Sequence, residues 1–483
     1  MMKFLPINII LALFIIFIIS CKKDKNFATN SLSFSNDTLK FDTVFTSLGS
    51  ITKFITIKNN EHKAIKIEEL KLSNTSNYRI NVDGDTGTIF KDVIIPANDS
   101  IYVFVEVTID PNSNNLPFVL LDSIQLKMEN KQQFVYLQAY GQNAHFFDGD
   151  TILVNTTWTN DLPYVILNYL SVDKNSTLNI QSGCKVYFGG NAAMLVEGKL
   201  NIQGGNDTSA AVLFKTYRLD KDISGTSYEK YPGQWAGLFF LRGSEGTIEY
   251  LNLQNAQYGI NVGNILITDN VAENTQKLND AKLSNGAKLV IKNSKIFNNS
   301  FYNIFGFLSK IQAENLLCYG AGTNIIGLYH GGDYSFINCT FFAQSNAYIS
   351  HSKTPAFYFS NYFMVGNTPI YADSSNLLVR NSIIYGTLNE ELFLDDISEN
   401  THKLYYTFNH SCIKNQTGNL MSNMYFQNCI NTDPKFENIL KSDFRLQDAS
   451  PCINGGNDID FYPLIDLSGK LRIGKPDIGA LEK

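Results

Sequence analysis

Val290-Ile291-Lys292-Asn293 is the first of five short frames in this chain that each end in an asparagine. The others are Gln312-Ala313-Glu314-Asn315, Phe336-Ile337-Asn338, Phe359-Ser360-Asn361 and Val379-Arg380-Asn381. Successive asparagines are separated by 22, 23, 23 and 20 residues. A period of roughly 20 to 50 residues is typical of repeat architectures, and the residues in between are strand-like rather than helical. We therefore predict a β-solenoid in which each repeat is one coil and the five amides form a structural ladder.

The composition supports a folded chain without a nucleic-acid partner. The chain has 483 residues, of which 44% are apolar, and a net charge of -6. That apolar share excludes a disordered chain. A single compact core does not grow to this length, whereas a solenoid can, because each coil contacts only its neighbours. The mild acidic balance supplies no basic patch, so we expect no binding to nucleic acid.

Residues 1–20 have the form of a secretory signal peptide. A short charged start is followed by the apolar run Ile9–Ile19, which is too short for a comfortable transmembrane helix. The run ends in Ile18-Ile19-Ser20-Cys21, which resembles the lipobox of bacterial lipoproteins. The resemblance implies acylation of Cys21, a tether over residues 21–30, and attachment to the cell envelope at the outer membrane. The alternative is a plain membrane helix with a chance cysteine.

Residues 31–145 are expected to form a β-sandwich. Short β-rich runs such as Ile101–Val107 alternate with turn signals such as Asp83-Gly84-Asp85. Many short strands at this spacing are typical of a β-sandwich. Segments 55–70 and 137–144 resemble the immunoglobulin-like domains of bacterial lipoproteins, which implies a spacer or a binding module.

Residues 151–483 are expected to form the solenoid. Strand triplets there are broken by turns that contain glycine, which tolerates the sharp corners of a coil. Together with Pro232–Leu238 they resemble the opening coils of right-handed parallel β-helices of the pectin lyase type. The tail segments Ser450–Gly456 and Pro476–Glu482 resemble the end of "choice-of-anchor" β-helix proteins. The predicted fold is therefore all-β, with an immunoglobulin-like sandwich followed by a right-handed parallel β-helix.

Two polar insertions, near 215–232 and 264–286, interrupt the expected coils, and loops on a rigid scaffold often carry function. The first insertion gathers aromatic residues whose faces could stack on sugar rings. These ligand-binding residues are Tyr217, Tyr228, Tyr231 and Trp235. For Trp235 the sequence favours the alternative, a side chain that closes the core at the end of a strand.

Four ionisable residues recur about once per expected coil. They are His330, His351, Asp373 and Asp395, separated by 21, 22 and 22 residues. In stacked coils they would lie along one face, about 4.8 Å apart. There they could serve as catalytic acid and base toward a glycan, or hold a cation such as calcium, although no motif for calcium or another cofactor is evident. The alternative is a solvated loop edge whose length drifts between coils.

Three functional hypotheses remain, because a β-helix alone does not set a function. The Gly-His-Gly and Arg-Ile-Lys motifs of polygalacturonases are absent from the chain. This favours a monomeric envelope lipoprotein that binds a polysaccharide or a surface partner without catalysis. The second hypothesis is a polysaccharide lyase or glycoside hydrolase, and the third is a structural component of the envelope.

Overall fold

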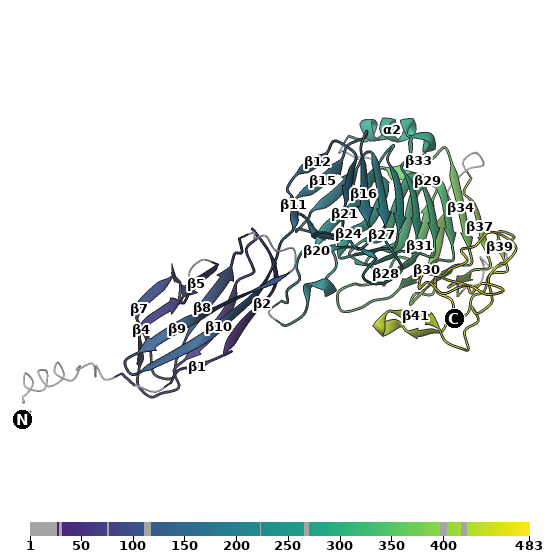
Figure 1. Cartoon of the computed structure of the whole chain (residues 1–483). Coiled ribbons are helices and arrows are strands. Elements are labelled where there is room, and N and C mark those ends of the chain that lie inside the picture. Colours follow the sequence, from purple (N-terminus) through teal and green to yellow (C-terminus); the bar gives the residue numbers. More distant parts are fainter. Residues whose placement is uncertain are drawn as a thin grey trace, which may run out of the picture. The chain divides into compact units, whose positions relative to one another are not determined.

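The computed structural model describes residues 27–28, 31–74, 77–110, 117–222, 224–264, 270–396, 403–416 and 423–483. The chain divides into two compact units, Met1–Asn143 and Ala144–Lys483 (Figure 1). The expected signal peptide and Cys21 lie outside the described residues. In the described part of the chain, no helix is long and apolar enough to cross a membrane.

The first unit is a two-sheet β-sandwich, as predicted. One sheet has the order β1 (Ser33–Phe34), β3 (Lys53–Lys58), β8 (Ser100–Val107), β5 (Tyr78–Val82) and β6 (Asp85–Gly87). The other has the order β2 (Thr38–Phe45), β10 (Lys131–Gln142), β9 (Phe118–Met128), β4 (Ile65–Leu72) and β7 (Ile89–Ile95). Neighbouring strands are antiparallel except β2 and β10, which are parallel. In β8, Val103 and Val105 are buried while Tyr102 is exposed, because successive side chains of a strand point to opposite faces.

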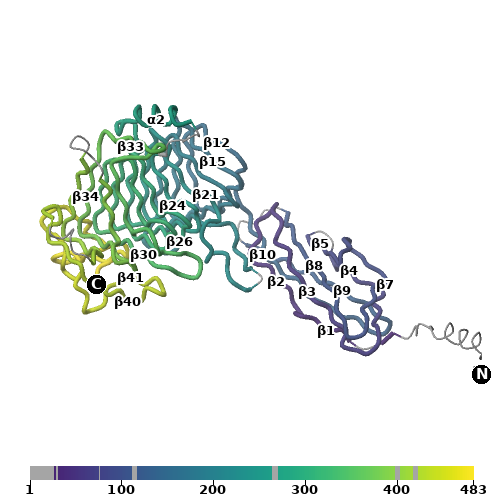
Figure 2. Tube along the Cα trace, turned by 180° about the vertical axis from the view of Figure 1, so that it is seen from behind, coloured from purple at the N-terminus to yellow at the C-terminus, as the bar shows by residue number. Residues whose placement is uncertain are grey.

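The second unit is a parallel β-helix with three strand faces, which we call faces A, B and C (Figures 1 and 2). Along the chain, a strand of face C is followed by one of face A and then one of face B. Faces A and B together form a 17-stranded sheet, and face C is a 10-stranded sheet. The first strand, β11, begins at His145, slightly before the expected start at Thr151. The predicted all-β fold class is thus confirmed.

The strands of each face are as follows. Face A contains β12 (Asp150–Ile152), β15 (Tyr169–Val172), β18 (Ala193–Val196), β21 (Trp235–Leu241), β24 (Ala256–Asn264), the first halves of β27 (Tyr302–Glu314) and β29 (Asn324–Ile337), β31 (Phe357–Ser360) and β36 (Leu392–Asp395). Face B contains β13 (Thr156–Trp158), β16 (Thr177–Gln181), β19 (Lys199–Gln203), β22 (Glu245–Glu249), β25 (Lys288–Lys292), the second halves of β27 and β29, β34 (Ser375–Arg380), β37 (Tyr405–Asn409) and β39 (Phe426–Gln427). Face C contains β11 (His145–Phe147), β14 (Tyr164–Ile166), β17 (Lys185–Phe188), β20 (Val212–Thr216), β23 (Leu251–Gln254), β26 (Lys295–Asn299), β28 (Leu317–Ala321), β30 (Thr340–Ala343), β35 (Ile383–Gly386) and β38 (Cys412–Ile413).

The core runs along the inside of the coils. The period of two in each strand sends alternate apolar residues inward, as Leu289 and Ile291 show in β25. Aromatic residues stack from coil to coil, and Phe188 lies 3.9 Å from Trp235 between ring centroids. Because each coil buries its apolar side chains against the next one, the stack supplies a continuous core.

Insertions decorate the corner between faces A and B. The helix α2 (Val271–Asp280) begins after Asn270, whose side chain accepts from the Glu273 amide. The sequence predicted a polar insertion here, but not the helix. Buried Leu278 of α2 packs with the hairpin of β32 (Tyr362–Val365) and β33 (Thr368–Tyr371), and both views place α2 beside β33 (Figures 1 and 2). The 3-10 turn η2 (Leu283–Asn285) follows α2.

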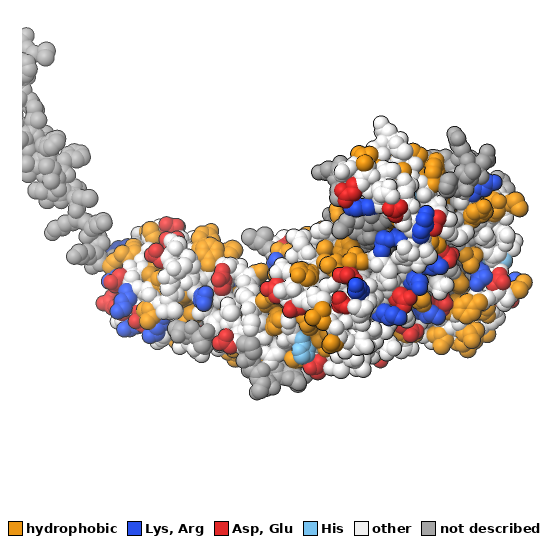
Figure 3. Space-filling view, turned by 90° about the horizontal axis from the view of Figure 1, so that it is seen from above, with side chains coloured by type: hydrophobic (Ala, Val, Ile, Leu, Met, Phe, Trp, Pro, Cys, Tyr) orange, Lys and Arg blue, Asp and Glu red, His pale blue; other side chains and the backbone are white. Residues whose placement is uncertain are grey.

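Two further short elements lie near face C, together with a hairpin. The 3-10 turn η1 (Tyr228–Lys230) belongs to the first insertion, and η4 (Ile439–Lys441) lies between β40 (Phe436–Asn438) and β41 (Asp443–Leu446). Over the face drawn in Figure 3, Lys and Arg side chains are interspersed with Asp and Glu, and neither sign gathers into a patch.

Candidate functional site

The asparagine ladder lies at the corner between faces B and C. Register places Asn293, Asn315, Asn338 and Asn381 one after another, because each directly follows a strand of face B that pairs with the next. All four adopt a left-handed backbone with φ between 49° and 52°. Asparagine tolerates this conformation better than most residues, which explains its recurrence at a tight corner.

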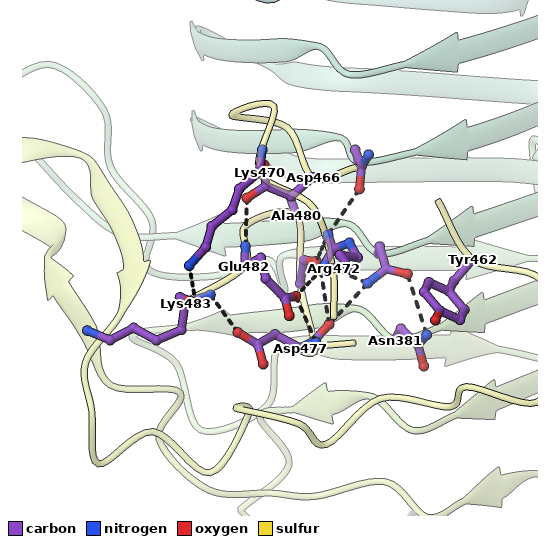
Figure 4. A network of polar contacts seen from close by, with 12 residues as sticks. Asn381, Tyr462, Asp466, Lys470, Arg472, Asp477, Ala480, Glu482 and Lys483 are labelled. Atoms are coloured by element: carbon purple, nitrogen blue, oxygen red, sulfur yellow. Dashed lines mark hydrogen bonds and ion pairs between the residues drawn. The ribbon is translucent and has the colours of Figure 1, made fainter. Parts of the chain in front are cut away.

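The C-terminal tail covers this asparagine corner (Figure 4). Asn338 Nδ2 donates to the carbonyl oxygens of Asp477 and Gly479, at 3.0 and 3.3 Å. The Arg472 guanidinium donates to Asn315 Oδ1 at 3.1 Å and pairs with Glu482 at 2.8 Å. Asn315, Asn338 and Asn381 are therefore bound to the chain's own tail, and Asn293 donates to Glu249, so this corner has little left to offer a ligand.

Asn361 does not belong to the ladder, which corrects the expectation from the sequence. It follows β31 on face A, and its Nδ2 donates to Asp396 Oδ1 at 3.0 Å. The coil from Asn338 to Asn381 contains the loop 344–356 and the hairpin β32–β33, so one coil occupies the length of two. Asn361 stands near the middle of that length by coincidence.

The expected row of His330, His351, Asp373 and Asp395 is also wrong as a row of one residue per coil. His351 and Asp373 lie in the same enlarged coil, and His351 occupies the loop that leads from face C to face A. There its Nε2 lies 3.0 Å from Glu391 Oε1, and both side chains are buried. Glu391 also accepts from the backbone amides of Ala356 and Leu388, so this pair fixes the loop rather than facing a ligand.

The other three residues lie near the corner between faces A and B but have separate partners. His330 is fully buried, stacks on Phe307 at 5.2 Å, and its Nδ1 lies 3.1 Å from the Ile370 carbonyl oxygen. Burial lowers the pKa of His330 to about 4, so the ring is neutral at pH 7. Asp373, whose charge acts on His330, accepts from the Leu283 amide at 3.2 Å.

The aromatic residues of the first insertion do not form one platform. Trp235 is buried, and its Nε1 donates to the Gln254 carbonyl oxygen at 2.8 Å. It therefore packs in the core at the start of β21, and its ring is not available to a sugar. Tyr228 lies beneath the Arg218 guanidinium at 3.7 Å. Tyr231 donates to Asp222 and packs edge-on against Tyr348 at 4.7 Å. Tyr217 is half-buried, and its backbone amide donates to the Phe188 carbonyl oxygen.

A row of aromatic rings on face A forms the most extended candidate site, which we call the aromatic strip. It consists of Phe239, Tyr258, Tyr302, Phe305, Tyr329, Tyr358 and Phe393. Neighbouring rings are in contact along the whole row, with centroids 4.7 to 6.3 Å apart. Register explains the row, because Tyr258 pairs with Tyr302, and Tyr358 pairs with Phe393 on adjacent coils. The strip thus crosses six coils, β21 to β36.

Glycine and hydroxyl groups shape the strip. Gly327 lies between Phe305 and Tyr358 in the register, and a Cβ there would stand 2.6 Å from the Tyr302 ring. The missing side chain therefore lets the Tyr302 ring lie across the strip, where its hydroxyl is 3.2 Å from that of Tyr329. Burial raises the pKa of both tyrosines, so these hydroxyls stay protonated.

Asp395 lies at the end of the strip. Its Oδ2 accepts from the hydroxyls of Tyr358, at 2.6 Å, and Tyr362, at 2.8 Å. Burial and the Asp395 contact raise the pKa of Tyr362 to about 12. Of the residues singled out from the sequence, Asp395 is the one that contacts the strip.

Sequence reasoning missed the strip, although a signal was present. Each ring occupies an outward position of a strand, between inward residues such as Ile304 and Leu328. Aromatic residues at outward positions in successive coils would have found it, had the coils been numbered correctly. Among the described residues, His, Cys, Asp and Glu side chains form no group of three or more that could hold a metal ion.

Comparisons with known proteins assign no family to this chain. No family model matches the sequence, and no curated protein matches it. Among solved structures, a family 123 glycoside hydrolase from Clostridium perfringens aligns with 24% of this chain and 30% of its own, at 11% identity and a TM-score of 0.19. A protein of unknown function from Porphyromonas gingivalis W83 aligns with 26% of this chain and 60% of its own, at 10% identity and a TM-score of 0.18. The alignments span less than two thirds of either protein, and likenesses at these scores do not define a function.

Proposed function

We propose that the β-helix binds an uncharged polysaccharide along the aromatic strip without cleaving it. The observation that carries this proposal is the strip itself, an unbroken row of partly exposed rings across six coils. Aromatic rings offer flat apolar faces, and tyrosine adds a polar edge, which suits the C–H face and hydroxyl rim of a sugar ring. A row of such rings fits a chain of sugars better than a single small ligand.

The charges around the strip favour an uncharged glycan. In the part of the chain that the structure describes, Lys and Arg groups lie over the rings of Phe41, Tyr187, Tyr228 and Tyr385, none of which belongs to the strip. An acidic polysaccharide would need such cations, or a bound metal ion, to offset its carboxylates. Asp395 would in addition repel it.

The side chains near the strip favour binding over hydrolysis. Glycoside hydrolases place two carboxyl groups on either side of the scissile bond. Asp395 is hydrogen-bonded to two tyrosine hydroxyls, and Asp373 is hydrogen-bonded to a backbone amide. His330 is fully buried and neutral, so it could not exchange a proton with a substrate on the surface.

Polysaccharide depletion tests the proposal. The chain from Lys22 onward, which keeps every described residue, is mixed with insoluble cellulose, chitin or curdlan, and the unbound protein and any new reducing ends are measured. We expect binding to at least one of these without new reducing ends. Phe393→Ala removes a ring that is 51% exposed and should weaken binding about two- to tenfold, since a stacking contact contributes about 0.5–1.5 kcal/mol.

Tyr405→Ala is the matched control, because Tyr405 is 61% exposed but lies on β37 of face B. It should bind like the wild type. Equal binding by Phe393→Ala and the wild type would contradict the strip as the binding site. Release of soluble sugars by the wild type would contradict binding without cleavage.

We also propose that Cys21 is lipidated and that the sandwich, as an immunoglobulin-like spacer, carries the β-helix away from the outer membrane. The sequence of residues 18–21 supports this proposal. Two or more acyl chains give stable attachment where one does not. Cys21→Ala should therefore move the protein from the membrane fraction to the aqueous fraction in cell fractionation, and equal membrane attachment would rule acylation out as the anchor.

A further inference from the structure

A groove on face C forms a cavity of about 580 Å³, separate from the aromatic strip. Its floor includes Phe297 of β26, Tyr319 of β28 and Phe342 of β30, which come from three successive coils. Its walls come from η1, the loop 344–348 and η4, so segments more than 200 residues apart in the chain enclose it. Volumes of about 300–1,000 Å³ are typical of small-molecule sites.

The floor of the groove is aromatic and apolar. The rings of Phe297 and Tyr319 are stacked at 4.9 Å with an interplanar angle of 8°. Phe444 supports Tyr319 from the side, at 4.9 Å. Burial raises the pKa of Tyr319 to about 12, so its hydroxyl stays protonated. The stacked pair and Phe342 together give the floor an apolar aromatic surface that spans three coils.

The walls are polar and are held in place by hydrogen bonds. Asn298 Nδ2 donates to the Glu229 carbonyl oxygen at 3.1 Å and fixes η1, while Gln344 Nε2 donates to the Ile439 carbonyl oxygen at 3.2 Å and fixes η4. Asn346 Oδ1 accepts from the amides of Tyr348 and Ile349, at 2.8 and 2.9 Å, and shapes the loop. Asn346 is exposed at the rim of the groove, where its Nδ2 can donate to a ligand.

The charges of the groove favour an uncharged ligand. The Glu229 carboxylate is paired with the Lys215 ammonium group, so its charge is offset within the protein. Lys230 also lines the groove, but it is exposed to water, which screens its charge. An apolar ligand would displace water from the Asn346 amide without replacing its hydrogen bond, which costs about 1–3 kcal/mol if that amide becomes buried. A ligand with a flat C–H face and a hydroxyl edge meets both the floor and the rim.

We propose that the face C groove binds one or two pyranose rings of an uncharged saccharide, as a second sugar site. This inference stands on its own cavity, and it does not require the aromatic strip to bind a polysaccharide. The groove is bounded by η1, the loop 344–348 and η4, so it suits a short sugar or a chain end, whereas the strip suits the interior of a chain.

Saturation-transfer NMR with cellobiose, maltose and N,N′-diacetylchitobiose tests the groove, using the chain from Lys22 onward. We expect transfer to at least one disaccharide. Tyr319→Ala removes the central one of the three floor rings and should reduce the affinity about tenfold. Because Tyr319 is packed against Phe444, a second variant, Tyr348→Ala, removes a wall residue that is 38% exposed and should reduce the affinity several-fold without unfolding the protein.

Tyr169→Ala is the matched control, because Tyr169 is 44% exposed on β15 and lies outside both sites. It should leave the transfer unchanged. Absence of transfer to all three disaccharides, or unchanged affinity in folded Tyr348→Ala, would overturn the proposal. Tyr348→Ala should still bind the insoluble polysaccharide like the wild type, because Tyr348 lies outside the aromatic strip. If the wild type bound no polysaccharide, the strip proposal would fail, but the disaccharide result for the groove would not change.

Discussion

The asparagine corner and the aromatic strip are carried by the same coils but differ in what covers them. Asn338 and Asn381 are fully buried, and their side chains bind the tail through the carbonyl oxygens of Gly479 and Asn457. The strip rings contact one another and remain partly exposed, and Phe393 is 51% exposed. Both rows follow from parallel register, which repeats one residue position from coil to coil.

The difference between the two rows shows which part of a coil produces a clear sequence repeat. At the asparagine corner the backbone needs a left-handed residue, so the same residue type recurs and the period is easy to read. On face A the backbone is extended and accepts many residue types, so Tyr, Phe and Gly alternate along one register. The clearest repeat therefore marks the part that the fold itself uses.

The largest expected effect is at the asparagine corner, with Arg472→Ala. The Arg472 side chain is buried, and burial lowers its pKa while raising that of Glu482. Removing the guanidinium leaves Glu482 without its ion pair and Asn315 without a donor. We expect a loss of about 3–5 kcal/mol in the free energy of unfolding, measured by urea denaturation.

Arg445→Ala is the control for this change, because Arg445 forms an exposed ion pair with Asp443 and should contribute nothing measurable. Binding to the strip by folded Arg472→Ala should persist, since the tail does not contact the rings. An equal stability of the two variants would mean that the tail does not hold the corner.

The second effect compares Asn338→Ala with Asn361→Ala. Asn338 has a φ of 52° and donates to two tail carbonyl oxygens, so alanine there should cost about 3 kcal/mol. Asn361 is not left-handed, and loss of its bond to Asp396 should cost about 1 kcal/mol. Urea denaturation of both variants measures the gap. An equal loss of unfolding free energy in the two variants would contradict the exclusion of Asn361 from the ladder.

The same two asparagines show how far the sequence could lead. The left-handed corner and the inward alternation are local, so the coils and the all-β fold could be predicted from residues such as Leu289, Ile291 and Asn293. The size of an insertion is not local, because the hairpin β32–β33 has the same strand-like composition as a coil. The unrecognised loop 344–356 and this hairpin therefore made one enlarged coil look like two, which misplaced His351, Asn361 and Asp373.

The third effect concerns the corner between faces A and B, beside the strip. The pKa of His330 is lowered from 6.5 to about 4, first by burial, while Asp373 raises it and Arg242 lowers it. Between those two values the unfolded chain binds a proton that the folded chain does not, so stability falls as the pH falls. From pH 7 to pH 5 this contributes a loss of about 2 kcal/mol.

His330→Asn removes the titrating group and keeps a residue that tolerates the φ of 55°. The difference in unfolding free energy between pH 7 and pH 5 should therefore shrink by about 2 kcal/mol in this variant. An unchanged pH dependence would show that His330 can take up a proton in the folded protein, and would return it to consideration as an acid or base.

The smallest expected change in stability, and the sharpest test of the strip, is Gly327→Ala. The added Cβ would stand 2.6 Å from the Tyr302 ring, so the ring must rotate out of the strip. Rotating the Tyr302 ring destabilises the folded protein by about 0.5–1.5 kcal/mol. Alanine also restricts the unfolded chain more than glycine does, and this stabilises the folded protein by about 0.4–1 kcal/mol. Unfolding should thus be nearly unchanged, while retention on the bound polysaccharide falls several-fold. Gly190→Ala, where a Cβ meets no atom within 4 Å, is the matched control. A Gly327→Ala protein that binds as well as this control would show that the rings act singly, and that the continuity of the strip is a consequence of the coil register alone.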